Sequence, residues 1–417
     1  MVIILLSLGR EKHMQITVNQ HYVPRFYMKH FANIKNVGTK KEKVLISFYQ
    51  FKDNKLKENI PTSSICSEDY FYDQDGKIEN TLADMEARWS KALKNTIDED
   101  FTVDDIESIR EFAIYQISRT KAMLSHNREV ATTMMNDILK QQFGDIADKN
   151  VVKELLENEI TPEFGLSIVK ETIPTIRDLE MKVITNKTDM RFITSDMPII
   201  IINPLGIYNA GLGSVGEIIF FPISPWKMVF FYDSKLFGNL PDRIYDKSII
   251  EIFNQYQYVS ADEQLLAKEI EDINHIVHCE ELNSKRKQLQ ETQKTNTLIN
   301  GVGTLFAVKS RSIPYYYTIP ILRLPKPLRK IPTNFRETFP REYSYHTRLA
   351  ILCRVYRDPG FIHDKELKEY LEKQQMYSKI LLNYLDSYWN TPKKDRIITP
   401  ELMKKLKEVP INAFMNK

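Results

Sequence analysis

The 417-residue chain is poor in the residues that mark specialised structural classes, with only three cysteines and 13 glycines. Cys66, Cys279 and Cys353 lie far apart and are odd in number, so they fit neither a disulfide framework nor a paired metal-ligand spacing. They favour a reducing compartment, and we expect a cytoplasmic protein. The low glycine content and an aromatic content of 11% argue against a disordered chain.

Long hydrophobic runs are also missing. The apolar stretch at residues 2–8 is shorter than the roughly 20 residues of a membrane span, and it lacks the flanks of a signal peptide. A second methionine, Met14, follows it. We interpret residues 1–13 as an upstream start extension or a short element without a catalytic role, and we expect no membrane span.

Charge of one sign is not in excess overall, since the net charge is +3, but it is unevenly distributed. Residues 1–308 hold 36 basic and 44 acidic side chains, whereas residues 309–357 hold 11 and 2. This contrast divides the chain into four parts. They are the start extension, a core domain at 14–287, a basic and aromatic-rich segment at 288–357 and a helical tail at 358–417. The oligomeric state is not indicated.

The basic segment interleaves cations with tyrosines and phenylalanines. Cations for phosphates and rings for stacking are what a single-stranded nucleic-acid groove uses. The pattern therefore predicts contact with a nucleic acid or nucleotide, and the alternative is a basic surface that pairs with the acidic remainder of the protein. The candidate contact residues are Arg311, Arg323, Lys326, Arg329, Lys330 and Arg336.

Hydrophobic periodicity predicts an α+β fold, with a helix-rich N-terminal half packed on a mainly antiparallel sheet and a basic C-terminal appendage. Helices are expected at 78–94 and from a capping box at Thr102 towards His126. The β-rich runs between residues 181 and 232 form the sheet, and residues 261–280 are expected to return to helix.

The block at residues 20–31, QHYVPRFYMKHF, is the most informative motif. Pro24 can open a helix, which would place His21 just before the N-terminus and Arg25 in the first turn. Free N–H groups there would favour an anion such as phosphate. Alternatively, the aromatic residues dock this helix, and His21 and Arg25 form hydrogen bonds with a neighbouring loop.

Two further candidates carry charge. Arg119 lies on a partly apolar helical face, so it needs a partner, which is either a buried carboxylate or a substrate phosphate or carboxylate. Ser195 and Asp196 precede Pro198, where the chain is expected to leave the sheet. Asp196 could act as a general base or metal ligand and Ser195 as a nucleophile or orienting group. The alternative is a turn that satisfies local backbone groups.

Two motifs carry less weight. Residues 211–216 match G-x-G-x-x-G by letter, but a strand-like run follows instead of the helix that a dinucleotide site requires, so a hairpin loop is predicted. His275, His278 and Cys279 fall within one helical turn and could bind zinc with ligands from elsewhere. Because no second cluster with metal spacing exists, packed or surface histidines are favoured.

With these blocks located, the chain resembles a bacterial domain-of-unknown-function family, number 4238, over residues 16–275. The family's His-Tyr-Val-Pro-Arg/Gln-Phe-Tyr-Leu-x-x-Phe segment is met by residues 21–31, and its F-I-T-S-D-x-P stretch by residues 192–198. Weaker matches are residues 69–72, Arg119-Thr120, residues 222–225 and Asn254. The resemblance implies that His21, Arg25, Arg119, Ser195 and Asp196 meet in space, and it implies no established reaction.

Two functions are therefore expected from different classes. The first is a hydrolase, nuclease-like or acting on nucleotides, of a toxin or phage-defence type, with His21 as acid/base, Arg25 and Arg119 as anion clamps, and Asp196 as base or divalent-metal ligand oriented by Ser195. Its cofactor is unknown, and a divalent metal would suit it. The second is a non-catalytic sensor or binding module for an anionic ligand or protein partner.

Overall fold

The computed structural model describes residues 17–143, 159–205 and 216–290, with short pieces at 156, 212–213, 294–299, 303–308, 313–314 and 317–322. The predicted start extension, the predicted helical tail and most of the basic segment lie outside the described residues. Within those residues, none of the helices has the length and apolar character needed to cross a bilayer.

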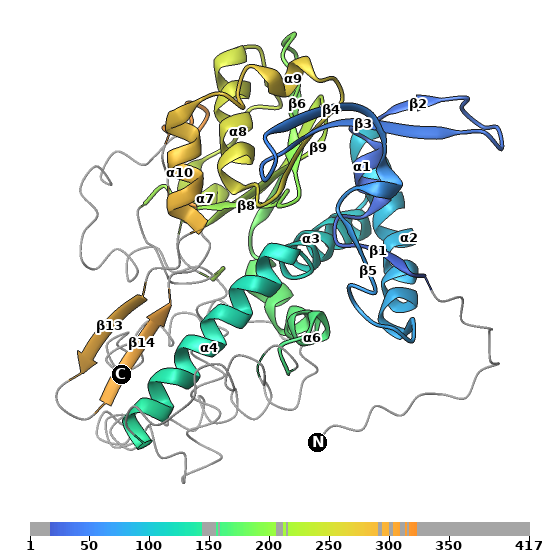
Figure 1. Ribbon diagram of the computed structural model, residues 1–417. Helices are drawn as coiled ribbons and strands as arrows, with labels where there is room; N and C mark the ends of the chain where they lie inside the picture. Colours follow the sequence, from blue (N-terminus) through green and yellow to red (C-terminus); the bar gives the residue numbers. More distant parts are fainter. Residues whose placement is uncertain are drawn as a thin grey trace, which may run out of the picture.

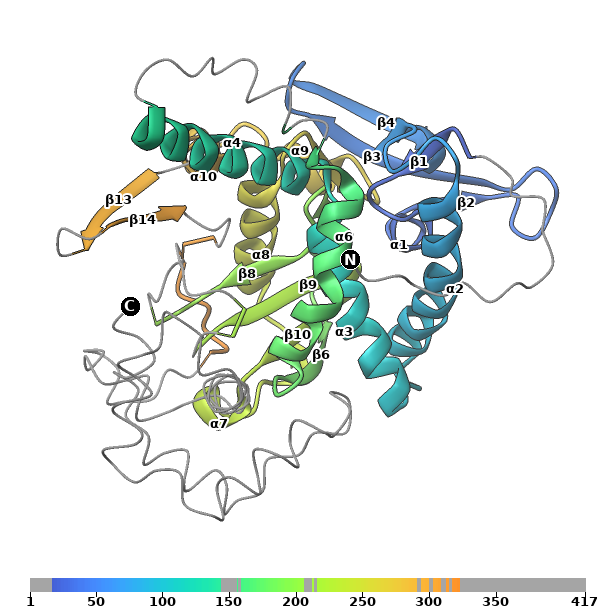
Figure 2. The ribbon, with the colours of Figure 1, turned by 90° about the horizontal axis from the view of Figure 1, so that it is seen from below.

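The fold is α+β and contains two mainly antiparallel five-stranded sheets (Figure 1). The first, the central sheet, has the strand order β11-β6-β10-β9-β8, and its inner strands lie side by side in Figure 2. All its pairings are antiparallel except that of β11 with β6. Its strands are β6 (Glu180–Asn186), β8 (Ile200–Ile202), β9 (Ile218–Ser224), β10 (Lys227–Tyr232) and β11 (Arg243–Ile244).

The second, the outer sheet, is organised around β3. Strands β2 and β12 follow each other along one edge of β3, and β4 pairs with the other edge. The β2–β3 hairpin extends away from the body of the molecule (Figure 1). The outer sheet contains β2 (Asn33–Lys35), β3 (Lys43–Gln50), β4 (Lys55–Pro61), β7 (Thr194–Ser195) and β12 (Gln264–Ala267), while β1 (Asn19–His21) pairs with β5 (Ser67–Asp69), and β13 (Lys294–Ile299) with β14 (Gly303–Val308).

Helices carry much of the remaining described chain. The short 3-10 helices are η1 (Thr62–Ser64) and η3 (Ile173–Ile176). The α-helices are α1 (Arg25–Lys29), α2 (Lys77–Asp98), α3 (Val103–Ser118), α4 (Lys121–Phe143), α6 (Pro162–Thr172), α7 (Ser234–Phe237), α8 (Lys247–Ser260), α9 (Glu271–Asn274) and α10 (Glu280–Gln290).

The predicted capping box is confirmed, but the predicted length of its helix is wrong. Thr102 accepts a hydrogen bond from the Asp105 backbone N–H, and Asp105 accepts one from that of Thr102. Helix α3 ends at Ser118, so Arg119 is its C-cap and α4 begins two residues later. Arg119 therefore lies at a junction between two helices and not within one.

The predicted helix at residues 261–280 is also wrong, because its first part forms strand β12. Leu265, Leu266 and Ala267 are fully buried, since β12 is covered by β3 on one edge and β7 on the other. A short apolar run that is buried on all sides has no distinguishing periodicity, so a buried strand cannot be told from a helix by pattern alone.

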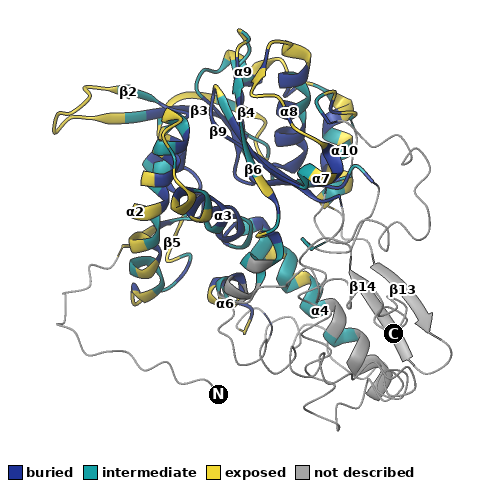
Figure 3. Ribbon diagram, turned by 180° about the vertical axis from the view of Figure 1, so that it is seen from behind, coloured by how far each residue is buried: buried dark blue, intermediate teal, exposed yellow. Residues whose placement is uncertain are grey.

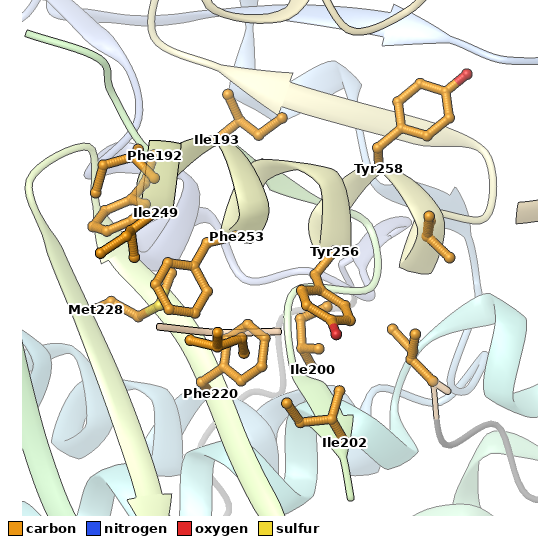
Figure 4. Close-up of a cluster of buried hydrophobic side chains, with 14 of the residues drawn as sticks. Phe192, Ile193, Ile200, Ile202, Phe220, Met228, Ile249, Phe253, Tyr256 and Tyr258 are labelled. Atoms are coloured by element: carbon orange, nitrogen blue, oxygen red, sulfur yellow. The ribbon is translucent and has the colours of Figure 1, made fainter. Parts of the chain in front are cut away.

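The central sheet separates two hydrophobic cores. Phe220 and Phe230 face one core, in which Phe253 of α8 packs against Phe220 (Figure 4). Phe221 and Phe231 face the other core, with residues of α2 and α3. Figure 3 shows the buried strands of this sheet between exposed outer surfaces. Because both faces are covered, β9 and β10 are apolar almost throughout and do not alternate with polar residues.

Candidate functional site

The motif at residues 20–31 forms the end of β1 and all of α1, as the position of Pro24 predicts. Pro24 is the N-cap of α1, and Arg25 is the first helical residue, exposed to solvent. The helix is only five residues long. It makes little more than one turn, so it lacks the row of aligned peptide groups that gives longer helices an anion-binding N-terminus. Any anion contact here depends on the Arg25 side chain itself.

His21 is partly buried at the end of β1, and its ring faces a backbone carbonyl. Its Nε2 lies 3.3 Å from the Thr62 carbonyl oxygen, which can only accept a hydrogen bond. Burial lowers the pKa of His21 to about 4, helped by the nearby charges of Arg25 and Arg119 and opposed by the hydrogen bond to Thr62. The imidazole is therefore neutral at pH 7 and donates to the Thr62 carbonyl at the start of η1.

Arg119 is almost completely buried, and the anion that it holds is a protein carboxylate. Its Nη1 donates to Glu86 at 2.7 Å, its Nε donates to the Tyr72 hydroxyl at 2.8 Å and its Nη2 donates to the His21 carbonyl at 2.8 Å. The partner is thus the carboxylate of Glu86, which is only partly buried, at 27% exposure of its side chain. Arg119 ties β1 to α2 and to the segment that follows β5.

Ser195 and Asp196 lie where the chain passes from the outer sheet to the central sheet. Strand β7 ends at Ser195 and β8 begins at Ile200, so the prediction that the chain leaves the sheet before Pro198 is confirmed. Helix α8 holds this crossing through Gln257, which accepts from the Ser195 hydroxyl at 3.0 Å and donates to the Pro198 carbonyl at 2.8 Å. The Ser195 hydroxyl oxygen also accepts from the Met197 N–H, as in a local turn.

The Asp196 carboxylate is buried and accepts three backbone N–H groups. Those of Asp262, Glu263 and Gln264 lie 2.9, 2.6 and 3.0 Å from its oxygens. Burial raises the pKa of Asp196 to about 7, with a contribution from Asp262, although the three donors oppose the shift. Arg286, which lies in α10, donates to the Asp262 carbonyl in the same turn. Asp196 therefore fixes the turn that leads into β12.

A buried network joins these blocks through residues that the motif analysis did not identify. Gln264 Oε1 lies 3.2 Å from both the backbone N and the Sγ of Cys66, and the Cys66 carbonyl accepts from the Tyr22 N–H at 3.0 Å. Cys66 adopts φ +50°, which is uncommon for a residue with a side chain. Burial raises the pKa of its thiol, so Cys66 is a neutral thiol and not a ready nucleophile.

Lys121 covers this network from the start of α4. Its Nζ lies 3.3 Å from Glu263 and 3.5 Å from Glu68, so it links the turn before β12 to β5. No sequence signal marked Lys121 or Gln264, because their roles depend on contacts across more than 50 residues. Only the adjacency of Lys121 to Arg119-Thr120 pointed to this place.

The motif blocks that carry the family resemblance also interlock. The Tyr27 hydroxyl lies 2.8 Å from Thr194 Oγ1 and donates to the Pro222 carbonyl at 2.7 Å. Asn254 accepts from the Ile193 N–H and donates to the Arg191 carbonyl. These blocks are therefore joined by hydrogen bonds that hold the two sheets and α8 together, while the expectation that His21, Arg25, Arg119, Ser195 and Asp196 share one site stays a prediction.

The two weaker motifs are described in part, since residues 211, 214 and 215 lie outside the described residues and His275 follows the end of α9, with its Nε2 3.1 Å from Glu251. Residue 216, the last glycine of G-x-G-x-x-G, is followed by strand β9, as predicted. Gly216 has φ +80°, and a Cβ there would lie 2.4 Å from a Leu205 methyl carbon, so local packing requires this glycine. In the part of the chain that the structure describes, no three His, Cys, Asp or Glu side chains are grouped as metal ligands.

A groove of about 430 Å³ between α2, α3 and η3 is lined by Arg88, Glu107, Glu111 and Arg177 among others, and it contains none of the predicted site residues. The predicted nucleic-acid contacts, Arg311, Arg323, Lys326, Arg329, Lys330 and Arg336, lie outside the described residues, so that hypothesis stays a prediction.

Comparison with known proteins identifies one family. A family model described as "Protein of unknown function (DUF4238)" matches residues 19–270, so the resemblance is confirmed. No curated protein and no solved structure matches the chain. The matched residues extend from β1 to just beyond β12. They include the junction around Asp196, where the chain passes from the outer sheet to the central sheet.

Proposed function

We propose a binding function for this chain, which belongs to the DUF4238 family of proteins of unknown function. Its core domain acts as a non-catalytic module that holds an anionic partner. The observation that carries this proposal is the engagement of Asp196, whose two carboxylate oxygens accept the backbone N–H groups of residues 262–264. The carboxylate best suited to base catalysis is thus engaged in hydrogen bonds to the backbone.

Arg119 and Ser195 are engaged in the same way, through Glu86 and Gln257. One group of exposed cations lies on α1 and on the β2–β3 hairpin. We call this surface the cationic face. It consists of Arg25, Lys29, Lys35, Lys40, Lys41 and Lys43, all of which are exposed. Lys29 joins the helix to the hairpin, since its Nζ lies 3.0 Å from Glu42.

A heparin column tests this proposal, because heparin is a polyanion that does not presuppose the partner. The variant Arg25→Gln/Lys35→Gln/Lys43→Gln should elute at lower salt than the parent, since each lost contact with an anionic group weakens the salt-dependent binding. A matched control, Lys187→Gln/Lys235→Gln/Lys247→Gln, removes the same charge from exposed positions outside this face. Equal elution of the two variants would contradict the proposal.

A hydrolase acting on RNA, DNA or a nucleotide is the second candidate. The observation that favours it is the pKa of Asp196, which burial raises to about 7, the range in which a general base works best. In this proposal Asp196 is the base, the neutral His21 assists it, and a cytoplasmic toxin or phage-defence role is the setting.

The two candidates differ in the turnover that they predict for the parent protein and for Asp196→Asn. An asparagine has one acceptor oxygen and turns an amide donor towards N–H groups, so at least one buried donor loses its partner, at about 1–3 kcal/mol of unfolding free energy. The binding proposal expects this loss of stability and no turnover in the parent protein. The hydrolase proposal requires turnover of RNA, DNA or nucleotides by the parent and a loss of about 100-fold or more in the variant under conditions where it stays folded.

A further inference from the structure

The β2–β3 hairpin forms a finger that stands clear of both cores. Every residue from 35 to 43 is exposed (Figure 3). Its turn is nevertheless ordered. Asn36 and Gly38 take positive φ values, the Thr39 hydroxyl donates to the Asn36 carbonyl at 2.8 Å, and the Gly38 N–H donates to Glu42 at 3.0 Å. Because hydrogen bonds already hold the turn, binding costs less conformational entropy than it would for a flexible loop.

The charges on this finger are not balanced within the protein. Residues 25–43 contain six cations and one carboxylate, that of Glu42. One oxygen of Glu42 binds Lys29, and the other accepts the Gly38 N–H, so the carboxylate is used to hold the turn. Among the described residues no ion pair is formed by Lys35, Lys40, Lys41 or Lys43.

Protection of an exposed strand edge explains only part of this pattern. Lysines on edge strands prevent unwanted pairing, which accounts for positions such as Lys35 and Lys43. Lys40 and Lys41 lie in the turn, where there is no strand edge to protect. Their charge is therefore available for an external anion.

The shape and composition of the finger select the kind of anion. The hairpin is a short two-stranded ribbon, paired at three positions from residues 33–35 to 43–45, with a protruding turn. A two-stranded ribbon fits the major groove of B-form DNA, which is about 12 Å wide, whereas that of A-form RNA is too deep and narrow. Single-stranded nucleic acid is bound with aromatic rings, and residues 33–43 contain none. Protein interfaces have an apolar core, but Val37 is the only apolar residue of the exposed tip at 35–43.

We infer that the β2–β3 hairpin enters the major groove of a DNA duplex, with Lys35, Lys40, Lys41 and Lys43 on the phosphates of the flanking strands. Val37, which is 70% exposed at the tip, reaches the base edges, where it can contact a thymine methyl group. This inference rests on the proposed binding function and names the partner of the cationic face.

Fluorescence anisotropy of the full chain with a labelled duplex of about two helical turns tests the inference. The variant Lys35→Gln/Lys40→Gln/Lys41→Gln/Lys43→Gln should bind the duplex at least about tenfold more weakly near 0.1 M salt, and its slope of log affinity against log salt should flatten by about 3–4, at roughly 0.9 per contact. The control Lys187→Gln/Lys235→Gln/Lys247→Gln/Lys287→Gln, also exposed, should stay close to the parent. Since all eight lysines are exposed, thermal melts of both variants should match the parent.

Three competitor probes complete the experiment, namely the single strand of the same sequence, a double-stranded RNA and polyglutamate. Preference for duplex DNA that is lost only in the hairpin variant supports the inference. Equal loss in both variants, or tighter binding of any competitor, overturns it. If hairpin-dependent binding is seen with polyglutamate and not with DNA, the binding function stands and the DNA assignment falls. If the hairpin variant binds every polyanion as tightly as the parent does, both the binding function and the DNA assignment are wrong.

Discussion

Arg119 is the residue at which burial and charge conflict most directly. Arg119 is 2% exposed, and hydrogen bonds to Glu86, Tyr72 and the His21 carbonyl stabilise its buried charge. A planar guanidinium reaches these three acceptors in three directions from one rigid group, whereas a lysine ammonium cannot occupy all three positions. The contacts are therefore specific to arginine.

Arg119→Lys should consequently lower the free energy of unfolding by about 2–4 kcal/mol, because a charge and at least one acceptor are left buried without a partner. Urea unfolding measures this loss. Arg88→Lys is the matched control, since Arg88 is paired with Glu111 on the surface and should change stability by less than about 0.5 kcal/mol. Equal effects of the two substitutions would contradict the contacts assigned to Arg119.

His21 makes stability depend on pH. Burial lowers the pKa of its imidazole to about 4 in the folded protein, against an ordinary value of 6.5. The folded state therefore binds fewer protons than the unfolded state between these values, and stability is fully present above pH 6.5 and is lost as pH falls towards 4. The partly buried His30 acts in the same direction.

Urea unfolding at pH 7.5 and pH 5 should show a smaller loss for His21→Gln than for the parent protein. The expected difference is on the order of 1 kcal/mol, because solvent still reaches part of the ring and reduces the effect. Parallel losses in the two proteins would mean that the ring is not excluded from water.

Side-chain chemistry predicted which of these residues need a partner, but not which partner they find. An arginine on an apolar face requires an anion, and both a protein carboxylate and a substrate phosphate satisfy that requirement. The choice of Glu86 depends on how α2 packs against α3, which is a long-range contact. Asp196 is similar, since its three donors come from residues 262–264, more than 60 positions away.

At the scale of secondary-structure elements, local chemistry predicted the boundaries that are set locally. The capping box at Thr102 and the break at Pro198 follow from hydrogen bonding within a few residues, and both are confirmed. The strand at Gln264–Ala267 pairs with β3, more than 200 residues away, and α3 ends at Ser118, where Arg119 contacts residues 21, 72 and 86. Local periodicity contains no information on those contacts, and both predictions failed.

Thr102→Ala tests the best-defined local signal. The alanine removes the acceptor for the Asp105 N–H at the start of α3, so unfolding free energy should fall by about 1 kcal/mol. Thr81→Ala in α2 is the control, because the Thr81 hydroxyl donates to the Lys77 carbonyl within an exposed helix turn and should contribute less than about 0.5 kcal/mol. Chemical denaturation of both variants decides whether the cap contributes to stability as its geometry indicates.

At the scale of the whole molecule, the central sheet is the structural link between two cores. Successive residues of β9 point to opposite faces, so Phe220 contacts Phe253 of α8 and Phe221 contacts Phe112 of α3. The junction around Asp196 adds a second link, since β7 and β8 belong to different sheets within a few residues. If one core lost its packing, one face of the central sheet would be exposed. The same sheet packs against the other core, so that core would be destabilised too.

The two cores should therefore unfold together, although they lie on opposite faces of the sheet. Phe220→Ala and Phe221→Ala each remove a fully buried ring from one core, and each should lower the unfolding free energy by about 3–5 kcal/mol. Because the sheet is shared, both variants should unfold in one transition with the denaturant dependence of the parent, whether the signal is tryptophan fluorescence or far-UV circular dichroism. Trp89 lies in the core that contains Phe221, so its fluorescence, read in a background with Trp226→Phe and Trp389→Phe, reports on that side. If Phe220→Ala unfolded in two steps, with Trp89 fluorescence changing only in the second, the cores would be separate folding units and the central sheet would not couple them.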